Sequence, residues 1–122
     1  MAMTHEEVRT MALSFPQTEE AMAYGRPAFK CFGKFLTRLR TEDASLVLYC
    51  TFDEREMFME AEPETFHLTP HYKDYPCVLA RIGVVDPGTV RGLLERRWRA
   101  CAPKTFLKQY DAAAGDRAGA RP

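Results

Sequence analysis

The residues of this chain that are best suited to chemistry lie in one basic and aromatic segment, residues 24–40. Its cationic side chains alternate with aromatic rings, and a Gly33-Lys34 pair stands where a hairpin would turn. Cations on a two-stranded ribbon beside flat rings suit a polyanion, and nucleic acid is the usual one. An ordinary amphipathic hairpin with a solvated face has the same pattern. The cations of this segment are Arg26, Lys30, Lys34, Arg38 and Arg40.

The register of this hairpin decides whether it has a basic face. A two-residue loop at Gly33-Lys34 places Lys30 and Arg38 on opposite faces, whereas a three-residue loop places Lys30, Arg38 and Arg40 on one face. Turn chemistry favours the first register, because Gly suits the first central position of a type II′ turn. The separation of basic and apolar side chains onto opposite faces favours the second register. The sequence leaves both open.

A second candidate site is the aromatic loop that follows Thr69. His71, Tyr72 and Tyr75 could stack on bases or line a small pocket, and Lys73 adds a cation among them. The tyrosines could equally cover the edge of a sheet.

No pattern predicts a metal site or a cofactor. His67 and His71 stand four apart with Cys77 further along the chain, but Pro70 prevents the helix that would bring both rings to one ion. The chain also has no nucleophile elbow, P-loop, dinucleotide-binding or zinc-protease motif. We therefore expect a domain that is not an enzyme.

Composition indicates one domain over residues 1–111. A chain of 122 residues with 46% hydrophobic residues can build its own core. We expect residues 112–122, which are rich in Ala, Gly, Asp and Arg, to be a disordered tail. Four widely separated cysteines without a C-x-x-C pair are typical of reduced, buried thiols. No apolar run approaches the ~20 residues of a membrane span, and the start does not resemble a signal peptide, so we expect a cytoplasmic protein.

The formal net charge of zero is the sum of unlike segments. Two basic segments, 24–40 and 91–108, flank an acidic one, 42–64. A local basic field is therefore possible if the two basic segments meet in space. Lys104 belongs to the second of them.

The elements that position these residues follow from caps and periodicity. Thr4 with Glu7, Asp53 with Glu56, and Asp86 before a proline each predict the start of a helix. Runs of apolar and β-branched residues predict strands over 28–32, 35–40, 45–51, 66–69 and 77–84. The order α-β-β-β-α-β-β-α with short hairpin connections predicts an α+β domain of two layers, an antiparallel sheet with helices on one face.

These residues also resemble a known family. The resemblance is to the MmcQ/YjbR family and covers about residues 4–111, through Tyr24-Gly-Arg-Pro-Ala-Phe29, Gly33-Lys34-Phe35, Thr69-Pro-His-Tyr72, Tyr75-Pro76 and Ala102-Pro103-Lys104. It implies a two-layer α+β fold with secretion-chaperone-like topology, a double-wing surface commonly labelled DNA-binding, and no catalytic residues. Family members usually have Trp after Tyr-Pro, where this chain has Cys77. The exchange alters either a binding surface or only core packing.

The function that we predict from the sequence is weak DNA binding by a small non-enzymatic domain. The alternatives are a protein-interaction module, including a homodimer, and a small-ligand pocket near His71, Tyr72 and Tyr75. The phosphate contacts would come from Arg26, Lys30, Lys34, Arg38, Arg40, Lys73 and Lys104.

Overall fold

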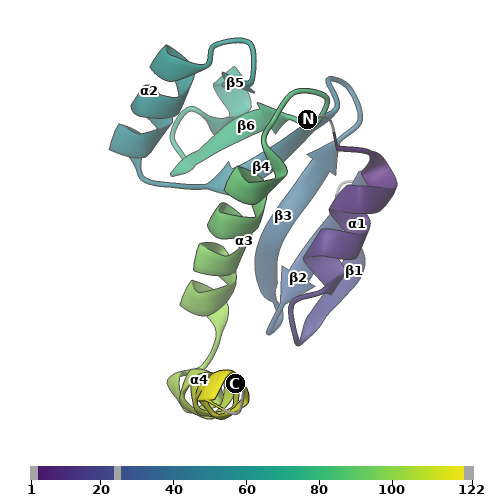
Figure 1. The fold of residues 1–122 in the computed structure, drawn as a ribbon. Helices are drawn as coiled ribbons and strands as arrows, with labels where there is room; N and C mark the ends of the chain where they lie inside the picture. The colour runs from purple at the N-terminus through teal and green to yellow at the C-terminus, as the bar shows by residue number, and fades with distance from the viewer. Residues whose placement is uncertain (1–2, 24–25, 120–122) are drawn as a thin grey trace.

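A six-stranded antiparallel sheet, in the order β1-β2-β3-β4-β6-β5, organises the residues that the computed structural model describes, 3–23 and 26–119 (Figure 1). This confirms the predicted α+β class. The order of elements also matches the prediction, with an added edge strand β1 and an added helix α4. The elements are α1 (His5–Leu13), β1 (Thr18–Ala23), β2 (Arg26–Cys31), β3 (Lys34–Arg40), β4 (Ser45–Tyr49), α2 (Phe52–Ala61), β5 (Phe66–His67), the 3₁₀ turn η1 (Pro70–Tyr72), β6 (Cys77–Arg81), α3 (Pro87–Cys101) and α4 (Lys104–Gly119).

Helices α1 and α3 begin at the predicted caps. The hydroxyl of Thr4 accepts a hydrogen bond from the backbone of Glu7, and the Glu7 carboxylate accepts one from the backbone of Thr4. Asp86 caps α3 by accepting from the backbone N–H of Thr89, with Pro87 as the first helical residue. These local bonds satisfy N–H groups that have no partner inside a helix.

The predicted cap of α2 is wrong by two residues. Thr51 and Glu54 form the capping box in place of Asp53 and Glu56. Thr51 has the extended backbone of an N-cap, with φ −72° and ψ 161°. Because both pairs satisfy the same spacing rule, the sequence pattern alone does not separate them.

The β2–β3 turn differs from both predicted loops. The central residues are Phe32 and Gly33, with φ of 53° and 76°, and Cys31 pairs with Lys34. Positive φ at both central positions is the mark of a type I′ turn, whose twist matches that of the flanking strands. Gly33 therefore occupies the second central position and not the predicted first.

A β-bulge in β3 determines which side chains share a face. Lys30 pairs with Phe35 but Phe29 pairs with Thr37, so Leu36 is an extra residue. Lys30, Phe35 and Arg38 consequently share one face, while Leu36 remains in the core. The predicted grouping of Lys30 with Arg38 is thus present, although by a bulge and not by a three-residue loop.

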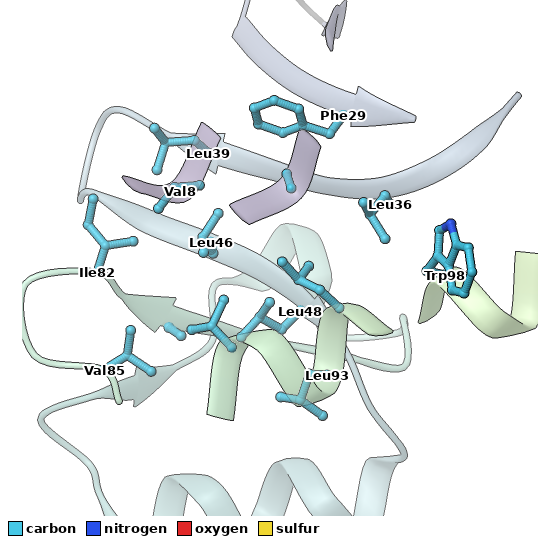
Figure 2. Packing of buried hydrophobic residues seen from close by; sticks show 14 of the residues in the cluster. Val8, Phe29, Leu36, Leu39, Leu46, Leu48, Ile82, Val85, Leu93 and Trp98 are labelled. Atoms are coloured by element: carbon cyan, nitrogen blue, oxygen red, sulfur yellow. The ribbon is translucent and has the colours of Figure 1, made fainter. Parts of the chain in front are cut away.

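The main core lies between the sheet and helices α1 and α3. Leu36 and Leu46, from adjacent central strands, are fully buried there (Figure 2). Trp98 of α3 is 1% exposed, and its indole N–H donates to the carbonyl of Pro16 at 2.8 Å. Burial of the ring together with a satisfied N–H fixes α3 against the sheet.

The opposite face of the sheet carries a smaller cluster. Val47 and Leu79 pair across β4 and β6 and are buried with Cys77 beneath Tyr72 of η1. Segment 68–76 therefore covers part of the face that the helices leave open.

Helix α4 begins beside the β2–β3 turn and continues to Gly119. Its Phe106 contacts Phe32, with ring centroids 5.0 Å apart, and its Tyr110 contacts Trp98 at the same distance. Residues 112–119 are helical where we expected disorder, since an Ala-rich stretch extends a turn that is already anchored. No helix in the described part of the chain is long and apolar enough to cross a membrane.

Candidate ligand-binding site

The structure divides the predicted phosphate contacts into two groups. Arg38 is buried, with 8% of its surface exposed, and Arg40 pairs with Asp43 at 3.3 Å and Glu42 at 3.8 Å. Lys30, Lys34, Lys73 and Lys104 are exposed. The side chain of Arg26 lies outside the described residues. Neither arginine of β3 therefore lies on the open surface, and only Arg40 is paired with carboxylates.

A cavity of about 180 Å³ lies on the face of the sheet opposite α1 and α3. Strands β3, β4 and β6 form its floor, and segment 68–76 forms its roof. This aromatic pocket is lined by Phe35, Arg38, Val47, Tyr49, His71, Tyr72, Tyr75 and Cys77. The lining is mostly apolar rings with one permanent charge, which is the usual composition of a small-molecule site.

The roof is held by Tyr72. Its ring is 9% exposed and lies near two guanidinium groups, with the Cζ of Arg38 5.8 Å and that of Arg40 5.7 Å from the ring centroid. His71 meets the edge of the same ring at 4.7 Å between centroids. Tyr75 is 55% exposed and stands at the rim. The three predicted pocket residues thus lie together, one as roof and two beside the opening.

The β3–β4 boundary forms one wall of the pocket. The two strands pair at Leu39–Leu46 and Arg40–Ser45. Closer to the β2–β3 turn, the hydroxyl of Thr37 donates to the carbonyl of Val47 at 2.7 Å. A side chain there takes the place of a backbone ladder bond, and the strands spread apart beside the cavity.

Arg97 of α3 contacts two residues of this wall. Its Nε donates to the carbonyl of Phe35 at 2.9 Å, and its Cζ lies 3.9 Å from the ring centroid of Tyr49. Phe35 and Tyr49 meet edge to face, with centroids 5.8 Å apart. These contacts pack the two rings against each other and against Arg97 without any bound ligand.

Arg38 is the unusual member of the lining. Its Nε is buried and has no hydrogen-bond partner among the described residues, and none of the lining residues is acidic. Arg40, by contrast, has its own counter-ion. Although burial alone would raise it, hydrogen bonding to Arg40 and the charge of Arg40 leave the pKa of Asp43 below its usual value. Only Arg38 brings an unbalanced positive charge to the cavity wall.

A Ser-His-Asp cluster lies elsewhere, at the start of β4. Nε2 of His67 is 2.8 Å from Oγ of Ser45 and 3.6 Å from Oδ2 of Asp43. Both partners meet the same ring nitrogen, and Ser45 has no exposed surface. A catalytic triad needs the carboxylate on the other nitrogen and a reachable hydroxyl. This cluster therefore joins strands and does not have triad geometry.

The cysteines and histidines form no metal site among the described residues. All four cysteines are free and buried, as predicted. Burial raises the pKa of Cys31 to about 12 and that of Cys50 to about 11, which keeps these thiols protonated and unreactive. Cys77 lines the aromatic pocket, so the residue that stands after Tyr-Pro belongs to the pocket wall as well as to the packed cluster.

Reasoning from the sequence missed three lining residues. Phe35, Val47 and Tyr49 lie in strands and read as core positions, whereas Cys77 was left open between a binding surface and the core. The alternation of side chains along β4 could have identified Val47 and Tyr49, because these two residues face away from Leu46 and Leu48. The continuous apolar run concealed it.

Fold and pocket together define a two-layer α+β domain with a cavity on its helix-free face. The chain belongs to the YjbR family, whose model matches residues 13–100. It is 31% identical over 98 residues to an uncharacterized protein of Mycobacterium tuberculosis and to one of Mycobacterium bovis, covering 77% of this chain and 76% of each relative. No solved structure gives a significant match.

Proposed function

We propose that this protein is a small-molecule binding domain and that its site is the aromatic pocket. The observation that carries the proposal is the cavity of about 180 Å³ whose apolar lining includes the buried, unpartnered Arg38. Preformed apolar cavities with few polar groups are the usual sites for small ligands. An engineered cavity of roughly 150 Å³ takes up benzene, so this one suits a compound with a single ring.

Two properties of the lining support binding over simple imperfect packing. Arg97 contacts Phe35 and Tyr49, and two arginines lie near the ring of Tyr72, so the walls are packed without a ligand. A buried guanidinium without an anion is also unfavourable, and Arg38 is the charged residue of the lining in this position.

The test is a titration followed by amide NMR. A set of compounds with one ring is added to the labelled protein, and shifts are mapped onto the chain. We expect saturable changes at the lining strands and in segment 68–76, with exposed residues of α1 unaffected. Saturation is the necessary observation, because weak surface association changes shifts linearly.

A filled pocket provides the control. Cys77→Met adds a flexible apolar side chain at the cavity wall, and Cys50→Met makes the same exchange at a buried cysteine that does not line this cavity. Binding should weaken in the first variant and persist in the second. If no compound binds the wild-type protein in a saturable way, the proposal is wrong.

DNA binding stays as a second candidate, and one observation favours it. The contact of Phe32 with Phe106 places the β2–β3 turn beside the start of α4, so Lys34 and Lys104 lie at the same end of the domain (Figure 1). Both lysines are exposed and have no ion-pair partner among the described residues. Two basic segments that are distant in sequence thus approach each other there.

Fluorescence anisotropy with a labelled duplex tests this candidate. The double variant Lys34→Ala, Lys104→Ala should bind more weakly than wild type, and the wild-type affinity should fall steeply between about 50 and 200 mM salt. Arg9→Ala is the control, because it removes from α1 a cation that is paired with Glu20 of β1. If neither salt nor the double substitution changes the affinity for DNA, DNA binding through Lys34 and Lys104 is ruled out.

We also propose that the domain has no catalytic activity. The buried Ser45 and the unsuitable His67 geometry support it. A homodimer stays a prediction, for which the edge strand β1 with its exposed Met22 offers a surface. Light scattering at several concentrations decides that question.

A further inference from the structure

We infer that the occupant of the aromatic pocket is a planar aromatic carboxylate with one ring, whose acid group pairs with Arg38. This inference rests on the proposed function and adds the chemical class of the ligand. It joins three properties of the pocket, namely its volume, the orientation of its rings and its unbalanced charge.

The charge is the most specific of the three. Arg38 is 8% exposed, its Nε has no hydrogen-bond partner, and no acidic residue lines the cavity. Other arginines of the described chain are balanced differently. Arg40, Arg96 and Arg99 each pair with carboxylates, and Arg97 donates to a backbone carbonyl. Only the Arg38 guanidinium is both buried and without a partner of either kind in the part of the chain that the structure describes.

A carboxylate is the group that complements the buried, unpaired guanidinium of Arg38. Arginine presents N–H donors in a planar fork that matches the two oxygens of a carboxylate. Such a pair is stronger where water is excluded, and a buried cation that lacks an anion is unfavourable. A bound acid therefore gains most from this position, whereas a ligand without charge leaves the guanidinium unpaired.

The rest of the ligand follows from the walls. A cavity of about 180 Å³ has room for one ring with a small substituent. Phe35 and Tyr72 line it with aromatic surfaces, and the edge-to-face contact of Phe35 with Tyr49 leaves little freedom for a bulky aliphatic group. Flat rings stack favourably in such surroundings. The rim at His71 and Tyr75 is the direction from which the ligand enters.

The experiment compares benzoate, benzamide and acetate by saturable NMR shifts in the wild-type protein. Benzamide has the same shape as benzoate without the charge, and acetate has the charge without the ring. We expect benzoate to bind about tenfold to a hundredfold more tightly than either, the range expected for a hydrogen bond to a charged group. This comparison needs no variant, so it stands even if a substitution impairs folding.

Variants then assign the effect to Arg38. Arg38→Met should remove the preference for benzoate over benzamide. Lys30→Met, which removes an exposed cation from the same face, should change neither. Equal affinity of benzoate and benzamide for wild type overturns the inference but not the proposed function. Binding of acetate as tight as that of benzoate also overturns it, and the absence of binding by every ring compound rejects the proposed function itself.

Discussion

The guanidinium of Arg38 in β3 lies over the ring of Tyr72 in η1, with the guanidinium carbon 5.8 Å from the ring centroid, and both residues line the aromatic pocket. This pair joins the two segments that the sequence offered as separate candidates, the basic hairpin and the aromatic loop. The relationship changes the role of the arginine. Instead of a surface contact for phosphate, Arg38 is a buried cation at the wall of a ligand-sized cavity.

Arg38→Met should leave stability unchanged or raise it, by up to about 2 kcal/mol, because replacing an unpaired buried charge with an apolar side chain removes a desolvation penalty. Chemical denaturation of the free protein measures the effect. Arg55→Met is the matched comparison, since Arg55 is equally buried but donates to the carbonyl of Tyr75 at 3.0 Å. That variant should lose about 1 kcal/mol or more. A large destabilisation by Arg38→Met would assign Arg38 a structural role.

Gly33→Ala should destabilise the protein by about 1 kcal/mol through backbone strain alone. Gly33 has φ of 76°, and a Cβ placed there meets nothing within 4 Å. The left-handed conformation is unfavourable for Ala although space is available. Thermal unfolding with calorimetry measures the loss. The exchange Gly83→Ala, where a Cβ also meets nothing within 4 Å, should have a smaller effect. Equal effects at both positions contradict the type I′ turn.

Thr51→Ala should cost about 1 kcal/mol of stability, while Asp53→Ala should cost little. Thr51 accepts the hydrogen bond from the backbone N–H of Glu54 that starts α2, and Asp53 lies inside the helix. Urea denaturation of both variants compares them directly. The reverse order of effects would restore the cap that the sequence pattern predicted.

Stability should fall as the pH drops through about 6.5, and His67 should be responsible for part of that fall. Burial, followed by the positive charge of Arg81, lowers the pKa of His67 in the folded protein. Between that lowered pKa and the unfolded value of about 6.5, the unfolded chain binds more protons than the folded one. The free energy of unfolding therefore decreases with decreasing pH in this window and levels off below it.

His67→Gln removes this contribution. Urea denaturation between about pH 7.5 and 5.5 should show a smaller decline in the variant than in wild type. The variant also loses the contact with Ser45, so its stability at high pH serves as the reference for each curve. Parallel curves for the two proteins would show that His67 does not titrate differently on folding.

Local chemistry made much of the fold predictable. The caps at Thr4 and Asp86 begin helices because short-range hydrogen bonds specify them. The register at Gly33 was not predictable, because the bulge at Leu36 depends on packing beneath β3 and leaves no trace in turn composition. Helix α4 is longer than we expected, because residues 112–119 continue the first turns of the helix, which pack on Trp98.

The candidate site was predictable only in part. His71, Tyr72 and Tyr75 were identified because aromatic residues in a loop are conspicuous. Val47 was not, since a strand that is buried on both faces shows no alternation in the sequence. That Arg38 points into a cavity follows from the bulge, which is a tertiary feature. Charge patterns alone could not separate it from the exposed Lys30.

A crystal structure of the protein grown with benzoate is the direct test of whether the aromatic pocket binds an aromatic carboxylate through Arg38. We predict electron density for the ring in the aromatic pocket, with a carboxylate oxygen about 3 Å from a guanidinium nitrogen of Arg38. The same density should be absent from crystals of Arg38→Met grown under identical conditions. An empty pocket in the wild-type crystal at saturating benzoate, or benzoate bound only elsewhere on the surface, would show that the aromatic pocket does not bind an aromatic acid.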